Sequence, residues 1–249
     1  MRKLIAAGAV CAAAFGAVTT AHAGPETQDA NGNYVVYDAD FAPPATGKGV
    51  KVTSANFAVS FGNKKSGSPF PRIEKLNLTM PSGTKYNGLK LTQCEANADG
   101  TLDCGKDDEV GDGTAAIDGR ALGLQDPITA TITAYNGPKR GGKPTLVLIA
   151  KATVNGMPIE SQINFQWTGR AFELFFTNSN RIAYSFSSLQ LRLGAYAKGK
   201  VPGHKAVITS LIQPPKTCPA RGWNFTLTEA DPAGNAITAG DFQPCVRLR

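Results

Sequence analysis

The sequence predicts an all-β fold, namely an antiparallel β-sandwich of two packed sheets with a disulfide-closed C-terminal hairpin. Three observations support this prediction. The chain of 249 residues holds 27 Gly and 16 Pro, so turn-forming residues are frequent. Apolar and polar residues alternate in short segments between these turn signals. Outside the N-terminal segment, no window shows the i, i+3, i+4, i+7 apolar stripe of an amphipathic helix.

The N-terminal segment has the features of a secretory signal peptide. Two basic residues precede an apolar, alanine-rich stretch over residues 4–18, and residues 21–23 read Ala-His-Ala. Signal peptidase recognises this small-x-small pattern. A retained membrane anchor is the alternative, but it needs roughly 18 or more apolar residues with suitable flanks. We therefore predict a signal peptide over residues 1–23 that is cleaved between Ala23 and Gly24.

Disulfides are the expected role of the remaining cysteines. Cleavage removes Cys11 and leaves Cys94, Cys104, Cys218 and Cys245. An even number of cysteines in an exported chain indicates disulfides, because the space outside the cytoplasm is oxidising. Three pairings exist, and chain order favours Cys94–Cys104 and Cys218–Cys245. Zinc is the alternative, but it usually needs close C-x-x-C pairs, which spacings of 10 and 27 residues do not provide.

Several segments alternate, or run continuously apolar, in the manner of β-strands. They lie at residues 51–61, 74–83, 126–137, 144–156, 159–169, 181–194, 205–215 and 222–230. Asn136-Gly137 is a strong turn signal and is predicted to end the third segment. Residues 24–33 are a polar start, and no repeat, low-complexity tract or clear linker follows. We therefore predict one β-sandwich domain over residues 24–249.

The last of these segments opens a hairpin that the second disulfide would close. Trp223 and Phe225 alternate with polar residues, and residues 231–235 (DPAGN) supply the turn. An isolated two-stranded unit is marginal in water, so we expect Trp223 to pack inward against the main sandwich. Phe165 and Trp167 alternate with polar residues in the same way and are predicted core residues as well.

Five short motifs follow one another along the chain. They are F-x-P-x-x-x-G (Phe41, Pro43, Gly47), L-x-x-P-x-G (Leu78, Pro81, Gly83), G-x-G-T-A (111–115), T-A-Y-N-G followed by a basic turn (133–144), and C-P-x-x-G-W-x-F (218–225) with a final Cys245. With this order of motifs the chain resembles a group of uncharacterised secreted β-sandwich proteins of actinobacterial type. The closing motif is the most specific part of the match. The resemblance implies export and a β-sandwich, and it implies no activity.

The chain lacks the residue sets of the common hydrolases and nucleotide-binding proteins. After cleavage His204 is the single histidine, and no G-x-S-x-G, H-E-x-x-H, Walker or dinucleotide motif is present. A glycosidase needs two carboxylates across a sugar. The glutamates available for such a pair are Glu74, Glu160, Glu173 and Glu229. We expect no catalytic residue, no metal and no cofactor, and we do not expect an enzyme.

One acidic loop matches part of a calcium-binding loop. The first, third, fifth, sixth and ninth positions of an EF-hand loop are occupied by Glu95, Asn97, Asp99, Gly100 and Asp103. The twelfth position should be a bidentate Glu and is Lys106, and flanking helices are not expected. A disulfide-closed turn without metal is therefore favoured, and weak calcium binding is the alternative.

Basic loops recur along the chain, which has a formal net charge of +7. They lie at residues 62–67, 136–144, 195–205 and 245–249. If they converge at one end of the sandwich, they would attract anionic envelope polymers. Solvated loops that maintain solubility explain them as well. No motif for binding nucleic acid accompanies them.

These observations favour a secreted, extracellular or cell-wall-associated monomer with a binding, adhesion or structural role. The expected partners are anionic envelope polymers or glycans. We expect no nucleic acid as a partner and no membrane span in the mature chain. The alternative is a secreted polysaccharide-active enzyme that uses paired carboxylates.

Overall fold

In the described part of the chain the regular structure is almost all β-strand, which confirms the predicted all-β class. The computed structural model describes residues 24–46, 54–65, 72–97, 101–118, 124, 127–176, 186–194, 196–199 and 207–247. The predicted signal peptide and His204 lie outside the described residues. Within the part of the chain described, the helices are short 3-10 turns, η1 (Gly88–Lys90) and η2 (Lys106–Asp108). No helix there is long and apolar enough to cross a membrane.

As far as the described residues show it, the main sheet has 12 strands, and neighbouring strands run antiparallel. Across the sheet they are β1 (Glu26–Gln28), β2 (Asn33–Ala42), β4 (Ser54–Asn63), β14 (Phe186–Gly194), β9 (Glu109–Ile117), β10 (Ile128–Arg140), β11 (Lys143–Val154), β12 (Met157–Trp167), β13 (Ala171–Phe175), β5 (Lys75–Thr79), β18 (Trp223–Ala230) and β19 (Ala236–Gln243). Four short pairs accompany it: β15 (Tyr196–Gly199) with β16 (Val207–Ser210), β6 (Lys85–Tyr86) with β17 (Ile212–Gln213), β3 (Ala45–Thr46) with β20 (Val246–Arg247), and β7 (Glu95–Ala96) with β8 (Leu102–Asp103).

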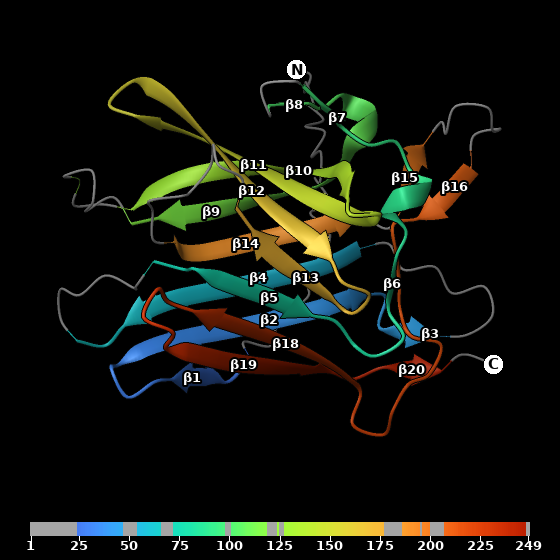
Figure 1. Ribbon diagram of the computed structural model, residues 1–249. Coiled ribbons are helices and arrows are strands. Elements are labelled where there is room, and N and C mark those ends of the chain that lie inside the picture. The colour runs from blue at the N-terminus through green and yellow to red at the C-terminus, as the bar shows by residue number, and fades with distance from the viewer. Residues whose placement is uncertain are drawn as a thin grey trace, which may run out of the picture.

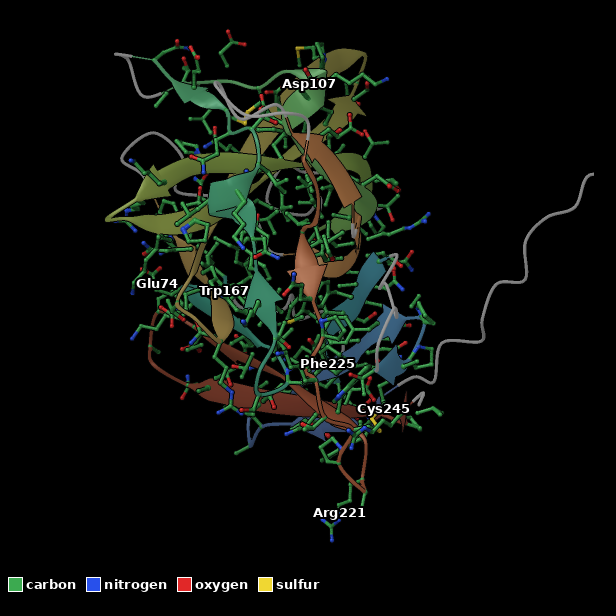
Figure 2. All side chains as sticks on the ribbon, turned by 90° about the vertical axis from the view of Figure 1, so that its right-hand side faces the viewer. Glu74, Asp107, Trp167, Arg221, Phe225 and Cys245 are labelled. Carbon is green, nitrogen blue, oxygen red and sulfur yellow. A yellow bond between two sulfur atoms is a disulfide. The ribbon has the colours of Figure 1, made fainter. Side chains whose placement is uncertain are left out.

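The main sheet curls until its last strand lies beside its second. In Figure 1, β13, β5 and β18 lie in front of the layer that contains β9, β14, β4 and β2. Figure 2, turned by 90°, shows the side chains that fill the space enclosed by the sheet. At the closing edge, β19 contacts both β1 and β2. The two facing layers of the predicted sandwich are therefore parts of one continuous antiparallel sheet.

Alternate residues of each long strand face the interior. On β2, Val35, Tyr37, Ala39 and Phe41 are 0–2 % exposed, whereas the residues between them are half-buried. On β12, Phe165 is 1 % exposed. This period-two burial is what strand geometry requires when one face of a sheet packs on a core.

Aromatic rings pack in two groups within the core. Phe41 of β2 meets Trp223 of β18 edge-on, with 5.3 Å between the ring centroids. Phe172 of β13 contacts Tyr86 and Trp167, each at 4.9 Å between ring centroids. Such pairs add to the stabilisation that the buried apolar area already provides. Both groups join residues from distant parts of the chain.

The C-terminal hairpin is closed by a disulfide, which confirms that prediction. Cys218 and Cys245 are bonded, with 5.7 Å between their Cα atoms. Trp223 is 1 % exposed and points inward, as the alternation predicts. At the turn, the carboxylate of Asp231 accepts hydrogen bonds from the main-chain and side-chain nitrogens of Asn235, at 2.9 and 2.8 Å. In Figure 2 the loop that carries Arg221 projects away from the body of the protein.

The predicted turn at Asn136-Gly137 is wrong. Strand β10 continues through these residues to Arg140, and the chain reverses at Gly141-Gly142, whose φ angles are 55° and 76°. The side chain of Asn136 is fully buried and donates hydrogen bonds of 2.8 and 2.6 Å to two main-chain carbonyl groups that follow β6. These long-range hydrogen bonds satisfy the amide, so the local turn preference of Asn-Gly does not decide the backbone.

Several observed strands are not among the predicted segments, including β2, β9 and β13 of the main sheet. The apolar positions of β2 directly follow the polar start of the chain, and β9 follows the acidic loop and contains Gly111 and Gly113. A Cβ atom at either glycine would collide with a main-chain oxygen of β14. The glycines therefore allow β9 and β14 to pack closely, although they weaken the local strand signal.

Side chains close the seam, by which we mean the contact between the edge of β2 and strand β19. Strand β1 pairs only with residues 34–36 of that edge. Beyond it, the Oδ2 atom of Asp241 accepts the main-chain N–H of Ala39 at 3.0 Å. The amide of Gln243 accepts from the N–H of Phe41 at 2.8 Å and donates to its carbonyl oxygen at 2.7 Å. Two side chains thus take the place of a hydrogen-bonded strand.

Candidate functional site

A polar groove crosses the outer face of four neighbouring strands, β2, β4, β14 and β9. We call it the outer-face groove; it is an open hollow of about 480 Å³. Its lining residues are Asp38, Ala39, Asp40, Asn56, Phe57, Ala58, Asp112, Gly113, Thr114, Gln190, Leu191 and Arg192. The core residues of these strands point to the other face, so strand alternation turns the polar side chains outward.

Strand register arranges the polar side chains of the groove in two rows. Cross-strand pairing places Asp40, Asn56, Arg192 and Asp112 in the first row. The second row contains Asp38, Ala58, Gln190 and Thr114. Residues within a row are about 4.8 Å apart between strands, and the rows are about 6.6 Å apart along the strands. The short side chain of Ala58 leaves the hollow between the longer ones.

The carboxyl group of Asp40 has a pKa above its ordinary value. Burial is the main cause, and the nearby carboxylate of Asp241 adds to it. A hydrogen bond of 2.6 Å from the side-chain nitrogen of Asn56 to Oδ1 of Asp40 opposes this shift, because it stabilises the charged form. The first row therefore begins with a carboxyl group that holds its proton more readily than an exposed aspartate.

The described lining of the groove carries an excess of negative charge. Asp38, Asp40 and Asp112 contribute carboxyl groups, and Arg192 contributes the single cationic group. The remaining polar side chains are amides and a hydroxyl, which can both donate and accept hydrogen bonds. Such a lining suits a ligand with many hydroxyl or amino groups and disfavours a polyanion.

A second hollow, of about 810 Å³, continues the polar face over β10, β11 and β12. It adjoins the groove, because Thr131 in its lining is the cross-strand partner of Thr114. The hollow also contains hydroxyl groups of two further threonines and an ion pair of 3.2 Å between Lys151 and Glu160. Together the two hollows form a polar face that crosses seven strands.

The four glutamates considered for catalysis do not line the outer-face groove. Glu160 lies in the adjoining hollow, where Lys151 neutralises it. Glu74 forms an ion pair of 3.0 Å with Arg72. Glu173 is exposed on β13, where it pairs across the sheet with Gln166 and Asn77. The structure therefore does not gather them as a carboxylate pair.

Glu229 differs from the other three because it lies in the interior face of β18 and is 3 % exposed. Its Oε2 atom has no hydrogen-bond partner among the described residues. Burial raises the pKa of its carboxyl group to about 7, and the charges of Asp231 and Asp29 contribute in the same direction. This group titrates near neutral pH, but it is enclosed by the fold.

The acidic loop is a disulfide-closed hairpin. Cys94 and Cys104 are bonded, with 4.4 Å between their Cα atoms, which confirms the second predicted pairing. The side-chain nitrogen of Asn97 donates to the hydroxyl of Thr101 at 3.0 Å within the loop. No group of three or more His, Cys, Asp or Glu side chains among the described residues is arranged to hold a metal ion. Asp99 lies outside those residues, so weak calcium binding stays a prediction.

The basic loops do not all converge. Lys64 follows β4 at the end of the sheet where β2 begins, since Asn63 pairs with Asn33. The registers of β14, β9 and β10 place Arg140 at the opposite end. Two of the side chains also have local partners: Lys64 pairs with Glu26 at 2.6 Å, and Arg140 stacks on a phenylalanine ring. Most of the loop at 195–205 lies outside the described residues.

The residues of the outer-face groove were missed by sequence reasoning. Asp38 and Asp40 lie on a strand that was not predicted, and Asp112 is the last residue of the segment at 95–112 that was interpreted as an acidic loop. The available signal was the period-two alternation of Val35, Tyr37, Ala39 and Phe41, which places both aspartates on the polar side.

Comparison with known proteins found no matching family model, no similar curated protein and no similar solved structure.

Proposed function

We propose that the protein is a secreted, envelope-associated binding protein without enzymatic activity, and that its outer-face groove holds a glycan chain. The observation that supports this proposal is the pair of cross-strand rows of hydrogen-bonding side chains on an open sheet face. An extended polymer of hydroxyl-bearing units can contact several strands of such a face at once. The two disulfides are typical of proteins that work outside the cytoplasm.

The charges of the groove favour a glycan that is uncharged or carries amino groups. The excess of carboxyl groups in the described lining repels anionic polymers. The basic loops that would attract such polymers are divided between the two ends of the sheet. We therefore favour glycans over anionic envelope polymers as the partner.

Binding to insoluble polysaccharides tests the proposal. The purified protein is mixed with uncharged, amino-bearing and carboxylate-bearing polysaccharides and with isolated cell walls, and the bound fraction is measured after sedimentation. We expect retention on an uncharged or amino-bearing polymer and not on the carboxylate-bearing one. A protein that stays in solution with every polysaccharide and with the walls contradicts the proposal.

Two variants locate the binding site. Ala58→Trp fills the hollow between the two rows and is expected to abolish retention. Thr238→Trp is the matched control, because Thr238 is exposed on β19, outside the groove lining, and should leave retention unchanged. Gln190→Ala removes one amide and is expected to weaken binding about tenfold, the effect of losing one or two hydrogen bonds. Equal retention of Ala58→Trp and the control would show that the glycan does not bind in the outer-face groove.

One observation favours a polysaccharide-active enzyme as the second candidate. Asp38 and Asp40 are two residues apart on the same face of β2, which separates their Cα atoms by about 6.6 Å. Both line the groove, and the raised pKa of Asp40 is the property that a general acid needs. New reducing ends produced by the wild-type protein, and lost in Asp40→Asn with binding retained, would establish this candidate in place of the first.

A further inference from the structure

The first residue of the predicted mature chain lies in the seam. Gly24 is buried, and only one residue separates it from β1. The register of β1, in which Glu26 pairs with Val36, brings residue 24 to the level of Asp38. Gly24 therefore lies where the pairing of β1 with β2 ends and the side chains of β19 take over. It fills the remaining length of the seam.

The place of Gly24 admits no side chain. A Cβ atom there would collide with the main-chain oxygen of Tyr37 and would lie 3.8 Å from the Cβ atom of Asp241. The Cα atom of Gly24 thus lies between the backbone of β2 and an acidic side chain of β19. Its main-chain nitrogen, one bond away, forms no hydrogen bond with any described residue.

Carboxyl groups gather at the seam. Asp241 is 8 % exposed, and among the described residues no Lys or Arg forms an ion pair with it. Asp38 and Asp40 are the chain neighbours of Ala39, whose N–H group Asp241 accepts, and they lie on the outer face of β2. After burial, which is the larger cause, Asp241 raises the pKa of Asp40 and of the Tyr37 hydroxyl, and Asp38 acts on Tyr37 as well. A buried carboxylate without a cationic partner is costly to the folded state.

We propose that cleavage of the Ala23–Gly24 bond completes the seam, because the new α-ammonium group of Gly24 pairs with the carboxylate of Asp241. The inference rests on the proposed export of the protein. A signal peptidase supplies the catalyst and water supplies the co-reactant. Hydrolysis leaves Ala23 as a carboxylate on the released peptide, and the nitrogen of Gly24 takes up protons to become an ammonium group. In the uncleaved chain the same nitrogen is a neutral amide with one proton, so it cannot neutralise Asp241.

The chemistry of the α-amino group provides a direct test on the unmodified protein. The protein is expressed with its own N-terminal segment and collected after export, and its first residue is identified by mass spectrometry. We expect Gly24 at the N-terminus. The pKa of its α-amine, measured by nitrogen NMR, should lie about one unit above the ordinary range near 7.7–8.0. Labelling of this amine at pH 7 should accordingly be about tenfold slower than in the unfolded protein.

Thermal unfolding provides the second test. A chain prepared with Ala23 retained is compared with the exported protein, and Asp241→Asn is made in both. Retaining Ala23 should lower Tm by roughly 5–10 °C, as expected when a largely buried ion pair loses one partner in a domain of this size. The effect of Ala23 should be much smaller in the Asp241→Asn chain. Glu173→Gln is the control, because this exposed carboxylate lies on another strand and should not change Tm or the effect of Ala23.

Three outcomes would overturn the inference. They are a mature N-terminus other than Gly24, an α-amine with ordinary pKa and labelling rate, and a Tm that does not depend on Ala23. None of these outcomes decides whether the outer-face groove binds glycans, which sedimentation measures separately. Loss of glycan binding with a protected α-amine would instead contradict the proposed function and leave the seam inference standing.

Discussion

The C-terminal hairpin and strand β2 lie on the two sides of the seam and are held in place by different means. The hairpin consists of β18 and β19, joined by a turn at residues 231–235 and tied by a disulfide between residues 27 positions apart. At the seam, β2 is held by side chains of Asp241 and Gln243, each 202 positions away from the residue that it contacts. One region is closed locally and covalently, and the other is closed by non-covalent contacts between distant residues.

This difference suggests where the fold opens first. A disulfide restricts the unfolded chain, so it stabilises the hairpin even when contacts around it fluctuate. The side-chain hydrogen bonds of the seam have no such support, and they break when β19 moves away from β2. We therefore expect local opening at the seam before the hairpin itself separates. The following variants test this order, from the largest expected effect to the smallest.

Trp223→Ala should have the largest effect, because this ring belongs to the hairpin and also contacts Phe41 of β2. Removing a buried Trp side chain typically costs roughly 3–5 kcal/mol in the free energy of unfolding. Urea unfolding followed by circular dichroism measures the loss. Phe242→Ala is the control on the same hairpin, and since Phe242 is 55 % exposed it should change stability by less than about 0.5 kcal/mol. Comparable losses in the two variants would show that Trp223 does not link the regions.

Replacing both Cys218 and Cys245 by Ser should cost about 3–4 kcal/mol, as the chain-entropy model predicts for a loop closed across 27 positions. The matched change at Cys94 and Cys104 opens a loop of 10 positions and should cost about 2.5–3 kcal/mol. Urea unfolding of the two double variants measures both losses. An unchanged rate of proteolysis at the C-terminus after removal of the first bond would contradict its role in holding the hairpin.

Glu229→Gln should change how stability depends on pH. The pKa of Glu229 is raised by burial from 4.5 to about 7 in the folded chain, so folding favours the protonated form. The free energy of unfolding should therefore fall as pH rises from 4.5 to 7, by on the order of 3 kcal/mol, and stay low above pH 7. The amide of the variant carries no charge at any of these pH values, so the variant should match the wild type at pH 4 and exceed it at pH 8. Parallel pH profiles for the two proteins would rule this out.

Gln243→Ala should have the smallest effect on global stability and the most local one. It removes the two hydrogen bonds to the main chain of Phe41, which is expected to cost about 1–3 kcal/mol. The amide of Phe41 should then exchange with solvent faster than the amides of the hairpin ladder. Gln166→Ala is the control, because its single hydrogen bond to Arg140 is exposed. Faster exchange throughout β18 and β19 would mean that the seam and the hairpin open together.

The features that the sequence predicted correctly are those set by short-range chemistry. Alternation of Trp223 and Phe225 with polar residues is enough to orient a strand, because side chains alternate between the faces of a sheet. The turn at 231–235 is specified by Asp, Pro, Gly and Asn within five residues. Four cysteines in a chain with a predicted export signal indicate disulfides, and the favoured local pairing is the one observed.

The features that sequence reasoning missed depend on long-range contacts. The side chain of Asn136 donates hydrogen bonds to main-chain carbonyl groups that lie 48 and 44 positions away in the chain, and these outweigh the local turn preference. Strand β9 was not predicted because its glycines weaken the strand pattern. The structural reason for these glycines is the close approach of the β14 backbone, which the sequence of β9 alone does not show. In each case the deciding partner is distant in the chain.

By itself, the sequence determined the all-β class, the alternating core positions, the C-terminal hairpin and both disulfides, because each depends on residue type and on spacing along the chain. Only the tertiary structure decided that the layers form one curled sheet and that its closing edge is joined by side chains. The tertiary structure also made the outer-face groove, since strand register brings Asp40, Asn56, Arg192 and Asp112 into one row. Register is a relation between strands, and no pattern within a single strand contains it.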